Sequence, residues 1–327
     1  MIRYATIGRG TIADQFVAGA ALSGRFQLVA VYSRNEETGR AWAQKHGCDT
    51  MYTDLDALAS AADIDAVYIA SPNSCHVPQS EAMLRGGKHV ICEKPIATSA
   101  AEYARLKALA DERGLVYMEA IIPRYVAGRR AIREALASIG NIASARLDFA
   151  QLTSRYEALQ RGEHVNIFDM SLAAGTLMDL GVYCVYAAVD LLGMPRGITA
   201  MASYLPNGAD CGGTALFDYG KFTAALTYTK VGHSAIGSEI TGDKGTLVIE
   251  RIGLYTGAYL VQNGVKTRLF DEEPKEALMS CEAAAFADFI GGKRREEYAE
   301  ASDLAWKVHT CMDTIKQAAN IRYGGDR

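Results

Sequence analysis

Apolar positions along the first 120 residues follow two different periods. Short runs rich in β-branched residues alternate with segments whose apolar residues recur at helical spacing. This alternation is typical of parallel βαβ units and predicts a doubly wound (Rossmann) sheet. The expected strands are Ile2–Ile7, Gln27–Tyr32, Asp65–Ala70, His89–Cys92 and Val116–Ala120. The expected helices are Thr11–Leu22, Asn35–His46, Val77–Arg85 and Ser99–Arg113.

The pattern changes after about Pro123. A helix, a strand, a polar loop and a second helix are followed by strands with no helix between them, separated by Gly, Asn and Asp. Turns of this composition join antiparallel neighbours. The expected elements are helices at Gly128–Ser138, Gly175–Leu192, Met279–Ile290 and Ser302–Ala319, and strands at Ile142–Ala150, Ile198–Tyr204, Gly213–Tyr219, Lys221–Thr229, Ser234–Thr241, Gly245–Glu250, Leu254–Val261 and Val265–Phe270.

These patterns predict two domains. Residues 1–122 form an α/β domain with a doubly wound parallel sheet. Residues 123–327 form an α+β domain with a large, mainly antiparallel open sheet, which we expect to bind substrate and to mediate dimerisation. The C-terminal helix of the second domain is free in this scheme to pack back on the first.

One strand of the second domain bears on assembly. Neither of its two faces carries a charge; one has Phe222, Ala224, Leu226 and Tyr228, and the other has Thr223, Ala225, Thr227 and Thr229. An uncharged open face suggests subunit contact, so we expect a homodimer through this sheet, with a tetramer as the larger alternative. A Thr-rich solvated face in a monomer is the competing interpretation.

Charge and cysteine content narrow the function classes. The 327 residues carry 34 basic and 38 acidic side chains, a net charge of −4, so neither nucleic acid nor an anionic membrane is an expected partner. The 7 cysteines are scattered without a C-x-x-C pair, which argues against a disulfide framework and a metal site. With no signal-peptide pattern and no charge-free run of membrane-span length, the sequence favours the cytoplasm.

A phosphate-binding turn follows the first strand. Gly8-Arg9-Gly10-Thr11-Ile12-Ala13 matches G-x-G-x-x-G/A and opens the first helix. Gly8 permits the tight turn, Gly10 lets a pyrophosphate approach the backbone, and Ala13 lets the helix pack closely on the strand. The amides at Thr11 and Ile12, at the positive end of the helix dipole, then hold the anion. Thr11 with Asp14 also fits a capping box, which needs no ligand.

The end of the second strand indicates which dinucleotide binds. NAD enzymes usually carry an acid there for the ribose 2′-hydroxyl, but this sequence has Ser33 and Arg34. A hydroxyl and a guanidinium suit a 2′-phosphate, and Arg9 adds a second cation, so we expect NADP(H). NAD(H) is the alternative, because Glu36 and Glu37 lie one turn further on and would reach the ribose if the strand ended later.

Several motifs together resemble one enzyme family. They are the phosphate turn, Ser71-Pro72-Asn73-Ser74-Cys75-His76, Glu93-Lys94-Pro95, Asp179-Leu180-Gly181-Val182-Tyr183, and Glu282 with Phe286 near the C-terminus. In this order and spacing they are similar to the glucose-fructose oxidoreductase / inositol dehydrogenase / MocA (Gfo/Idh/MocA) family. Many members carry His where this chain has Tyr183. The Tyr version resembles the branch with D-xylose and dihydrodiol dehydrogenases.

The resemblance implies that Lys94, Asp179 and Tyr183 are catalytic. Lys94 follows a strand end, at the sheet edge where doubly wound folds bind ligands. Asp179 and Tyr183 are four residues apart, so on a helix they share one face. Oxidising an alcohol needs a base for its proton, and a nearby Lys94 ammonium would lower the tyrosine pKa toward that role. Asp179 would orient the substrate or Lys94. As an alternative, Tyr183 is a core residue within an apolar run.

Other candidate contacts depend mainly on the resemblance or on their place in the chain. The resemblance implies cofactor contacts from Ser71, Pro72, Asn73, His76, Glu93 and Lys94; for Asn73 and His76, a simple turn is the alternative. Arg124 and Glu119 are candidates for substrate or cofactor, with an interdomain ion pair as the alternative. Candidate sugar contacts in the polar loop are Arg155, Tyr156, His164 and Asn166.

The sequence thus predicts an NADP(H)-dependent oxidoreductase. Hydride would pass between the nicotinamide and a hydroxyl or carbonyl carbon of a sugar, a small cyclic polyol or a dihydrodiol. The alternative is a sensor that keeps the fold and cofactor site without turnover. The presence of Lys94, Asp179 and Tyr183 together argues against the sensor, because a sensor has no chemical need for that set.

Overall fold

The structure, a computed structural model, describes residues 1–323 and forms two compact units. Unit 1 comprises Met1–Tyr125 and Glu273–Asp303, and unit 2 comprises Val126–Glu272 with the chain from Leu304 onward. The first boundary lies three residues beyond the one expected at 122. Residues 273–303 had been expected in the second domain, and they pack instead with the first.

Unit 1 is built on a six-stranded parallel sheet. Its order is β3-β2-β1-β4-β5-β6, so successive strands extend the sheet to one side from β1 to β3 and to the other side from β4 to β6, and the direction of this extension reverses between β1 and β4. That reversal creates a crevice at the carboxyl ends of the strands, where doubly wound folds bind nucleotides. The strands are β1 (Ile2–Ile7), β2 (Phe26–Tyr32), β3 (Met51–Tyr52), β4 (Ala66–Ile69), β5 (His89–Glu93) and β6 (Tyr117–Ala120).

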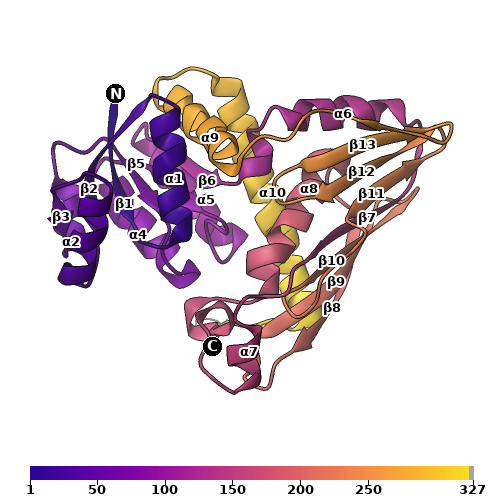
Figure 1. The fold of residues 1–327 in the computed structure, drawn as a ribbon, viewed down its shortest axis with the longest axis horizontal. Coiled ribbons are helices and arrows are strands. Elements are labelled where there is room, and N and C mark those ends of the chain that lie inside the picture. Colours follow the sequence, from indigo (N-terminus) through magenta and orange to yellow (C-terminus); the bar gives the residue numbers. More distant parts are fainter. Residues whose placement is uncertain (324–327) are drawn as a thin grey trace. The chain divides into compact units, whose positions relative to one another are not determined.

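Helices cover both faces of this sheet (Figure 1). They are α1 (Thr11–Leu22), α2 (Glu36–Lys45), α3 (Leu55–Ser60), α4 (Asn73–Arg85) and α5 (Ala100–Glu112). All four residues of β4 are buried, as expected for a central strand covered on both sides. The Phe16 ring of α1 stacks on Tyr68 of β4, with ring centroids 3.7 Å apart. The predicted parallel sheet is therefore confirmed, with β3 as an addition too short for sequence periodicity to reveal.

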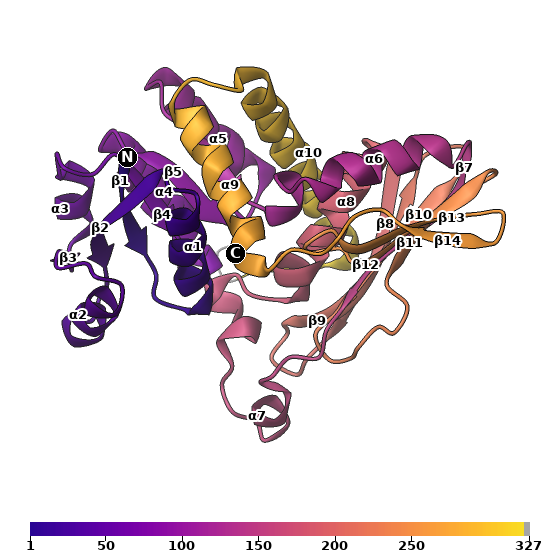
Figure 2. The ribbon, with the colours of Figure 1, turned by 45° about the horizontal axis from the view of Figure 1, so that its top comes forward.

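Helix α9 (Lys275–Ile290) belongs to unit 1 because it packs along α1 (Figures 1 and 2). At Gly19 of α1 an added Cβ would lie 2.8 Å from the Cβ of Met279, so the two helices approach closely only because residue 19 is glycine. Phe286 stacks on Phe26 of β2 with centroids 6.0 Å apart. Tertiary packing of an apolar helix thus determines its unit, whatever its position in the sequence.

Unit 2 is built on an eight-stranded sheet of order β14-β13-β12-β11-β7-β10-β9-β8. Only β7 and β10 pair in parallel; the other neighbours are antiparallel, which confirms the predicted mainly antiparallel sheet. The strands are β7 (Ile142–Ala150), β8 (Gly197–Tyr204), β9 (Asp210–Asp218), β10 (Thr223–Thr229), β11 (Ser238–Gly242), β12 (Gly245–Arg251), β13 (Thr256–Gln262) and β14 (Val265–Arg268).

One face of this sheet packs on helices α6 (Gly128–Ser138) and α8 (Val182–Leu192) (Figure 2). On β10 the side chains facing them, Ala224, Leu226 and Tyr228, are fully buried, so the predicted alternation is confirmed. The opposite face exposes alternate residues of β8 and β9. Its exposed residues include Met201 of β8 and Leu216 of β9, which are 80% and 49% exposed.

The remaining helices complete the two units. A short helix, α7 (Tyr156–Gln160), lies in the loop after β7, and 3-10 turns cover Ile122–Arg124, Asn166–Phe168 and Met170–Leu172. The long helix α10 (Arg295–Ala319) contributes its first residues to unit 1 and the rest, from Leu304, to unit 2. Within the described residues, Met170–Leu192 is long and apolar enough to span a bilayer, but most of it is buried in the fold, as for a core helix.

Candidate active site

The turn after β1 has the backbone geometry that a dinucleotide pyrophosphate requires. Gly8 adopts φ +119°, and a Cβ there would lie 2.3 Å from the carbonyl oxygen of Ala70, so only glycine fits. A Cβ at Gly10, by contrast, would meet nothing within 4 Å. The first position lets two strand ends approach, and the second leaves open space over the start of α1. The tight turn expected at Gly8 is observed, and the approach of a pyrophosphate at Gly10 stays a prediction.

Helix α1 begins at Thr11 with Gly10 as its N-cap and no side-chain cap. The expected capping box is wrong: the Asp14 carboxylate instead accepts a hydrogen bond from Trp42 Nε1 at 2.9 Å and pairs with Lys45 and His46. Burial opposes ionisation of Asp14, but these contacts lower its pKa overall. Asp14 therefore holds α2 against α1, and the N-terminus of α1 has no side chain over its amides.

The edge of β2 presents a cation. β2 ends at Tyr32, as expected, and the buried Ser33 hydroxyl donates to the carbonyl oxygen of Asn35 at 2.8 Å, shaping the turn. Arg34 is exposed, and residues 1–323 supply it no ion-pair partner; the same holds for Arg9. Glu36, the competing candidate, is bound to Arg40 of its own helix at 2.6 Å. A carboxylate engaged in this way is less suited to bind a ribose.

His76 joins the loops that follow β4 and β5. It lies in α4, which starts earlier than expected, at Asn73. Its side chain is buried; Nε2 lies 2.8 Å from the Ser71 carbonyl oxygen and Nδ1 lies 2.8 Å from that of Pro95. Burial lowers its pKa. This placement gives His76 a supporting role, since it aligns the two loops beside the expected nicotinamide position.

Lys94 directly follows β5 and precedes a cis peptide bond to Pro95. The Glu93 carboxylate accepts a hydrogen bond from the Tyr68 hydroxyl at 2.7 Å, and burial raises its pKa. Lys275, at the start of α9, lies close enough that the charge of Lys94 adds to burial in lowering its pKa. Glu282 of α9 is fully buried, which raises its pKa well above the usual range. Two lysines, the partly buried Glu93 and the fully buried Glu282 thus lie in this corner of unit 1.

Glu119 and Arg124, candidates at the domain crossing, have partners inside unit 1. The Glu119 carboxylate accepts a hydrogen bond from the backbone N–H of Ile96 at 2.9 Å. The Arg124 guanidinium is 4% exposed and pairs with Glu297 at 3.4 Å and Glu300 at 3.5 Å. These contacts stabilise the unit, and a guanidinium so enclosed is poorly placed to bind substrate. Arg124 therefore has no part in the function proposed below.

In unit 2, Asp179 lies in a π-helical turn, Leu177–Gly181, that leads into α8. Such turns insert one extra residue into a helix and are common at functional sites. The Asp179 carboxylate forms an ion pair with Lys230, which directly follows β10. Sequence reasoning missed Lys230 because nothing in the local pattern at the end of β10 distinguishes it from a solvated lysine.

A buried aspartate holds the start of this turn. Asp210 accepts a hydrogen bond from the backbone N–H of Leu177 at 2.7 Å, and its own carbonyl accepts one from the Thr176 hydroxyl at 3.0 Å. A Cβ at Gly175 would lie 2.0 Å from the carboxylate, so glycine is required for this approach. Burial raises the pKa of Asp210 to about 6, although Lys230 and the backbone hydrogen bonds act in the opposite direction.

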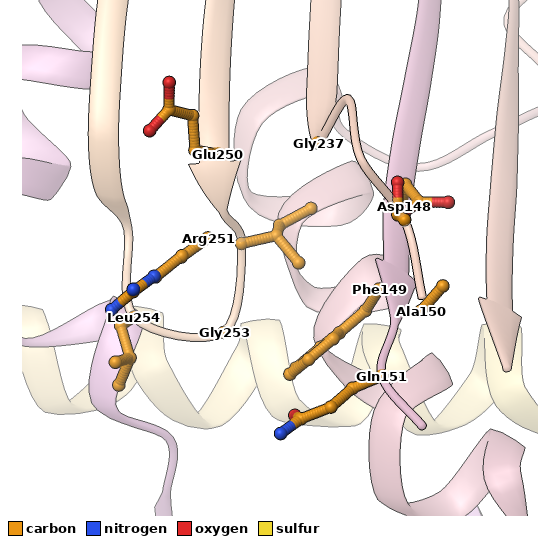
Figure 3. A pocket seen from close by; sticks show the side chains of 11 residues that line it. Asp148, Phe149, Ala150, Gln151, Gly237, Glu250, Arg251, Gly253 and Leu254 are labelled. Carbon is orange, nitrogen blue, oxygen red and sulfur yellow. The ribbon is translucent and has the colours of Figure 1, made fainter. Parts of the chain in front are cut away.

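Tyr183, in the first turn of α8, lies against the end of β7. Its ring packs on Phe149, with centroids 5.4 Å apart and planes at 55°. Phe149 also lines a cavity of about 400 Å³, a size suited to small ligands. Figure 3 shows Phe149 and Gln151 at the end of β7, Arg251 at the end of β12, and Leu254 in the turn that follows β12. Asp148, Ser234 and Glu250 add polar groups to the lining.

The polar-loop candidates are spread along the segment after β7. Arg155 precedes α7, and Tyr156 begins it. His164 contacts the Asp169 carboxylate at 2.8 Å, and Asn166 starts a 3-10 turn. The expected contact of these side chains with a sugar stays a prediction.

Two family models match most of the chain. The oxidoreductase family model with the NAD-binding Rossmann fold (GFO_IDH_MocA) matches residues 2–121, and the GFO/IDH/MocA C-terminal domain model matches residues 130–248. The chain belongs to the Gfo/Idh/MocA oxidoreductase family. The resemblance found from the motifs is thereby confirmed.

Relatives of this Gfo/Idh/MocA protein are dehydrogenases and reductases. The uncharacterized oxidoreductase YgjR of Escherichia coli (strain K12) is 37% identical over 290 residues, covering 89% of this chain and 88% of the relative. The scyllo-inositol 2-dehydrogenase (NADP(+)) IolU of Bacillus subtilis (strain 168) is 34% identical over 328 residues and the full length of both chains.

A solved structure has the same fold. KijD10, a 3-ketoreductase from Actinomadura kijaniata in complex with NADP and TDP-benzene, superposes with a TM-score of 0.83 at 25% identity, covering 97% of this chain and 98% of that one. With these relatives, the protein is an NAD(P)-dependent oxidoreductase that acts on CH–OH groups or the corresponding carbonyls.

The raised pKa of Asp210 predicts a pH dependence of stability. In the unfolded protein Asp210 has its ordinary pKa of 3.8, whereas in the folded protein its pKa is about 6. Between pH 3.8 and about pH 6, Asp210 is therefore deprotonated in the unfolded state but still protonated in the folded state. The free energy of unfolding falls as the pH rises through this range. Over this window we expect a loss of ~3 kcal/mol. Because the Asp210→Asn side chain cannot ionise, this variant should not show the loss of stability. Its amide oxygen can still accept the hydrogen bond from the N–H of Leu177.

Urea unfolding of both proteins from pH 4 to pH 7 measures the difference. Asp218→Asn, at the exposed end of the same strand, is the matched control. If the difference in the free energy of unfolding between wild type and Asp210→Asn stays constant from pH 4 to pH 7, the raised pKa of Asp210 is contradicted.

Proposed function

We propose that this protein transfers hydride between NADP(H) and a hydroxyl or carbonyl carbon of a sugar or small cyclic polyol. When bound, the nicotinamide would accept the hydride from the substrate C–H bond, and in this oxidative direction the phenolate form of Tyr183 accepts the hydroxyl proton. In the reductive direction Tyr183 returns the proton. Lys94 is the cationic partner and substrate anchor, and Asp179 accepts a hydrogen bond from a substrate hydroxyl.

One observation carries this proposal: each unit holds one ready-made part of the chemistry. In unit 1, the glycine turn and Lys94 follow strands that end at the same edge of one sheet. In unit 2, Asp179 lies in the π-turn and Tyr183 in the first turn of α8, where the Tyr183 ring packs on Phe149, a residue that lines the cavity. Carboxylate, amide and guanidinium groups around an aromatic ring suit a polyhydroxylated substrate.

A substrate panel tests the reaction class. Purified protein with NADP(H) should change the nicotinamide absorbance with at least one aldose, ketose, inositol or dihydrodiol. Cofactor binding without turnover on any of these compounds would favour the alternative, a sensor with the same fold.

Tyr183→Phe tests the proton-transfer role. Loss of the hydroxyl removes the general acid–base group and should lower kcat by about 10² or more, while the Kd for NADPH changes little. The variant keeps the ring against Phe149, so folding should be preserved. Tyr259→Phe, on β13, is the matched control. An unchanged kcat in Tyr183→Phe would remove this residue from the mechanism.

Arg34→Ala tests the cofactor preference. If the guanidinium binds the 2′-phosphate, its loss should weaken NADPH binding about tenfold or more, the effect of a lost charge-assisted hydrogen bond, and NADH binding much less. Titration of cofactor fluorescence gives both Kd values, with the exposed Arg85→Ala as control. Equal losses for the two cofactors would show that the 2′-phosphate is bound elsewhere.

We further propose that the open sheet of unit 2 forms a homodimer. Along one row of paired strands, its outward residues run Thr199, Leu216, Ala225, Arg146 and Glu239, apolar at one end and oppositely charged at the other. Leu216→Glu should convert a dimer to a monomer in sedimentation experiments, whereas Leu22→Glu, an exposed leucine of α1, should not. A monomeric wild type would refute the proposal; a tetramer would require a second interface.

A further inference from the structure

Lys230 is a buried lysine that the reaction outlined above leaves without a role. Its side chain is only 8% exposed, and its ammonium pairs with the Asp179 carboxylate, whose side chain is 39% exposed. A lysine is seldom buried this far without a partner, because desolvating an ammonium is unfavourable. The pair therefore joins a buried cation to a carboxylate that a ligand can still reach.

The backbone of Lys230 is held on both sides. Its N–H donates to the carbonyl oxygen of Cys211 at 3.1 Å, and its carbonyl accepts from the N–H of Thr153 at 2.9 Å. These bonds tie the residue to the start of β9 and to the loop after β7. The ammonium therefore projects from a fixed point toward the π-turn.

The π-turn is held independently of Lys230. Asp210 binds the N–H of Leu177 at the start of the turn, so the position of the helix does not require the ion pair. What the ion pair adds is local: it constrains the Asp179 side chain and favours its ionised form. An ionised carboxylate can only accept hydrogen bonds, so a substrate hydroxyl that binds to Asp179 must act as the donor.

We propose that Lys230 is a positioning residue that keeps Asp179 ionised and oriented toward a substrate hydroxyl. This inference rests on the proposed function, in which Asp179 binds substrate. Lys230 acts through Asp179 and takes no part in hydride or proton transfer. Lys230 thus contributes to substrate recognition, whereas Lys94 acts next to the reacting atoms.

Other titratable groups lie on the elements that pack against the turn. They include Asp148 of β7, Asp210 and Cys211 of β9, Tyr228 of β10, and Tyr183 and Cys184 of α8. Burial raises the pKa of Tyr228, Cys184 and Cys211, so these three stay neutral in acid. Asp210 titrates near pH 6 and is the group that an experiment must separate from Asp179.

The first experiment compares pH profiles of kcat/KM for wild type, Lys230→Met and Lys230→Arg. Without the cation, Asp179 should become protonated at higher pH, so the acid limb of Lys230→Met should move up by about one pH unit or more. At neutral pH, KM should rise about tenfold or more with a smaller change in kcat. Lys230→Arg should restore most of both. Lys221→Met, an exposed lysine just before the same strand, is the control.

Two further variants guard against a merely structural effect. Asp210→Asn should leave the acid limb in place, which separates the two carboxyls. If Lys230→Met fails to fold, the double variant Asp179→Asn/Lys230→Met leaves no unpaired charge. It should be no less active than Asp179→Asn alone, because Lys230 acts through Asp179. A double variant much weaker than Asp179→Asn would overturn the proposal.

A second readout does not depend on turnover. With ¹³C-labelled aspartate, the Asp179 carboxyl signal, assigned by its loss in Asp179→Asn, can be followed by NMR as pH changes. It should titrate at higher pH in Lys230→Met than in wild type. If the Asp179 signal titrates at the same pH in Lys230→Met and in wild type, the proposed role of Lys230 is wrong. This result can be obtained even if no substrate turnover is detected. Absence of turnover in wild type would instead refute the proposed function.

Discussion

The cofactor half of this enzyme depends on how closely two strand ends approach. The turn after β1 passes the carbonyl oxygen of Ala70 so tightly that only glycine fits at position 8. This contact brings the start of α1 to the edge between β1 and β4, where strand order reverses. The loops after β4 and β5 are aligned at the same edge by His76, which contacts a backbone carbonyl in each. Lys94 takes its position from that alignment.

Unit 2 meets a comparable requirement with buried charge. A π-turn leaves backbone groups that ordinary helical bonding does not satisfy, and Asp210 supplies an acceptor at its start. This carboxyl is buried, and its raised pKa shows the unfavourable desolvation that the arrangement entails. The Lys230 ammonium pairs with Asp179, and its charge also acts to lower the pKa of Asp210. The candidate catalytic helix is therefore supported by a small polar cluster inside an otherwise apolar core.

Much of the fold follows from local sequence. The elements at Ile2–Ile7, Thr11–Leu22, Gly128–Ser138 and Ile142–Ala150 begin and end where their periodicity predicts, because period and cap are properties of neighbouring residues. Short elements were not predicted, because two residues such as Met51 and Tyr52 of β3 are too few to show a hydrophobic period. The unit to which α9 belongs was also not predicted, because the sequence of an apolar helix face does not specify which surface packs against it.

The site shows the same division. The sequence by itself determined the glycine turn and the end of β2 at Tyr32, since each depends on neighbours in the chain. The candidates Lys94, Asp179 and Tyr183 came from the resemblance to a family. Only the tertiary structure decided that Asp14 ties two helices together, that Arg124 is enclosed in an ion-pair cluster, and that Lys230 pairs with Asp179. The physical reason is that the partner of a charge is chosen by distance in space. Residues 51 positions apart acquire a common role only when β10 and the π-turn pack together.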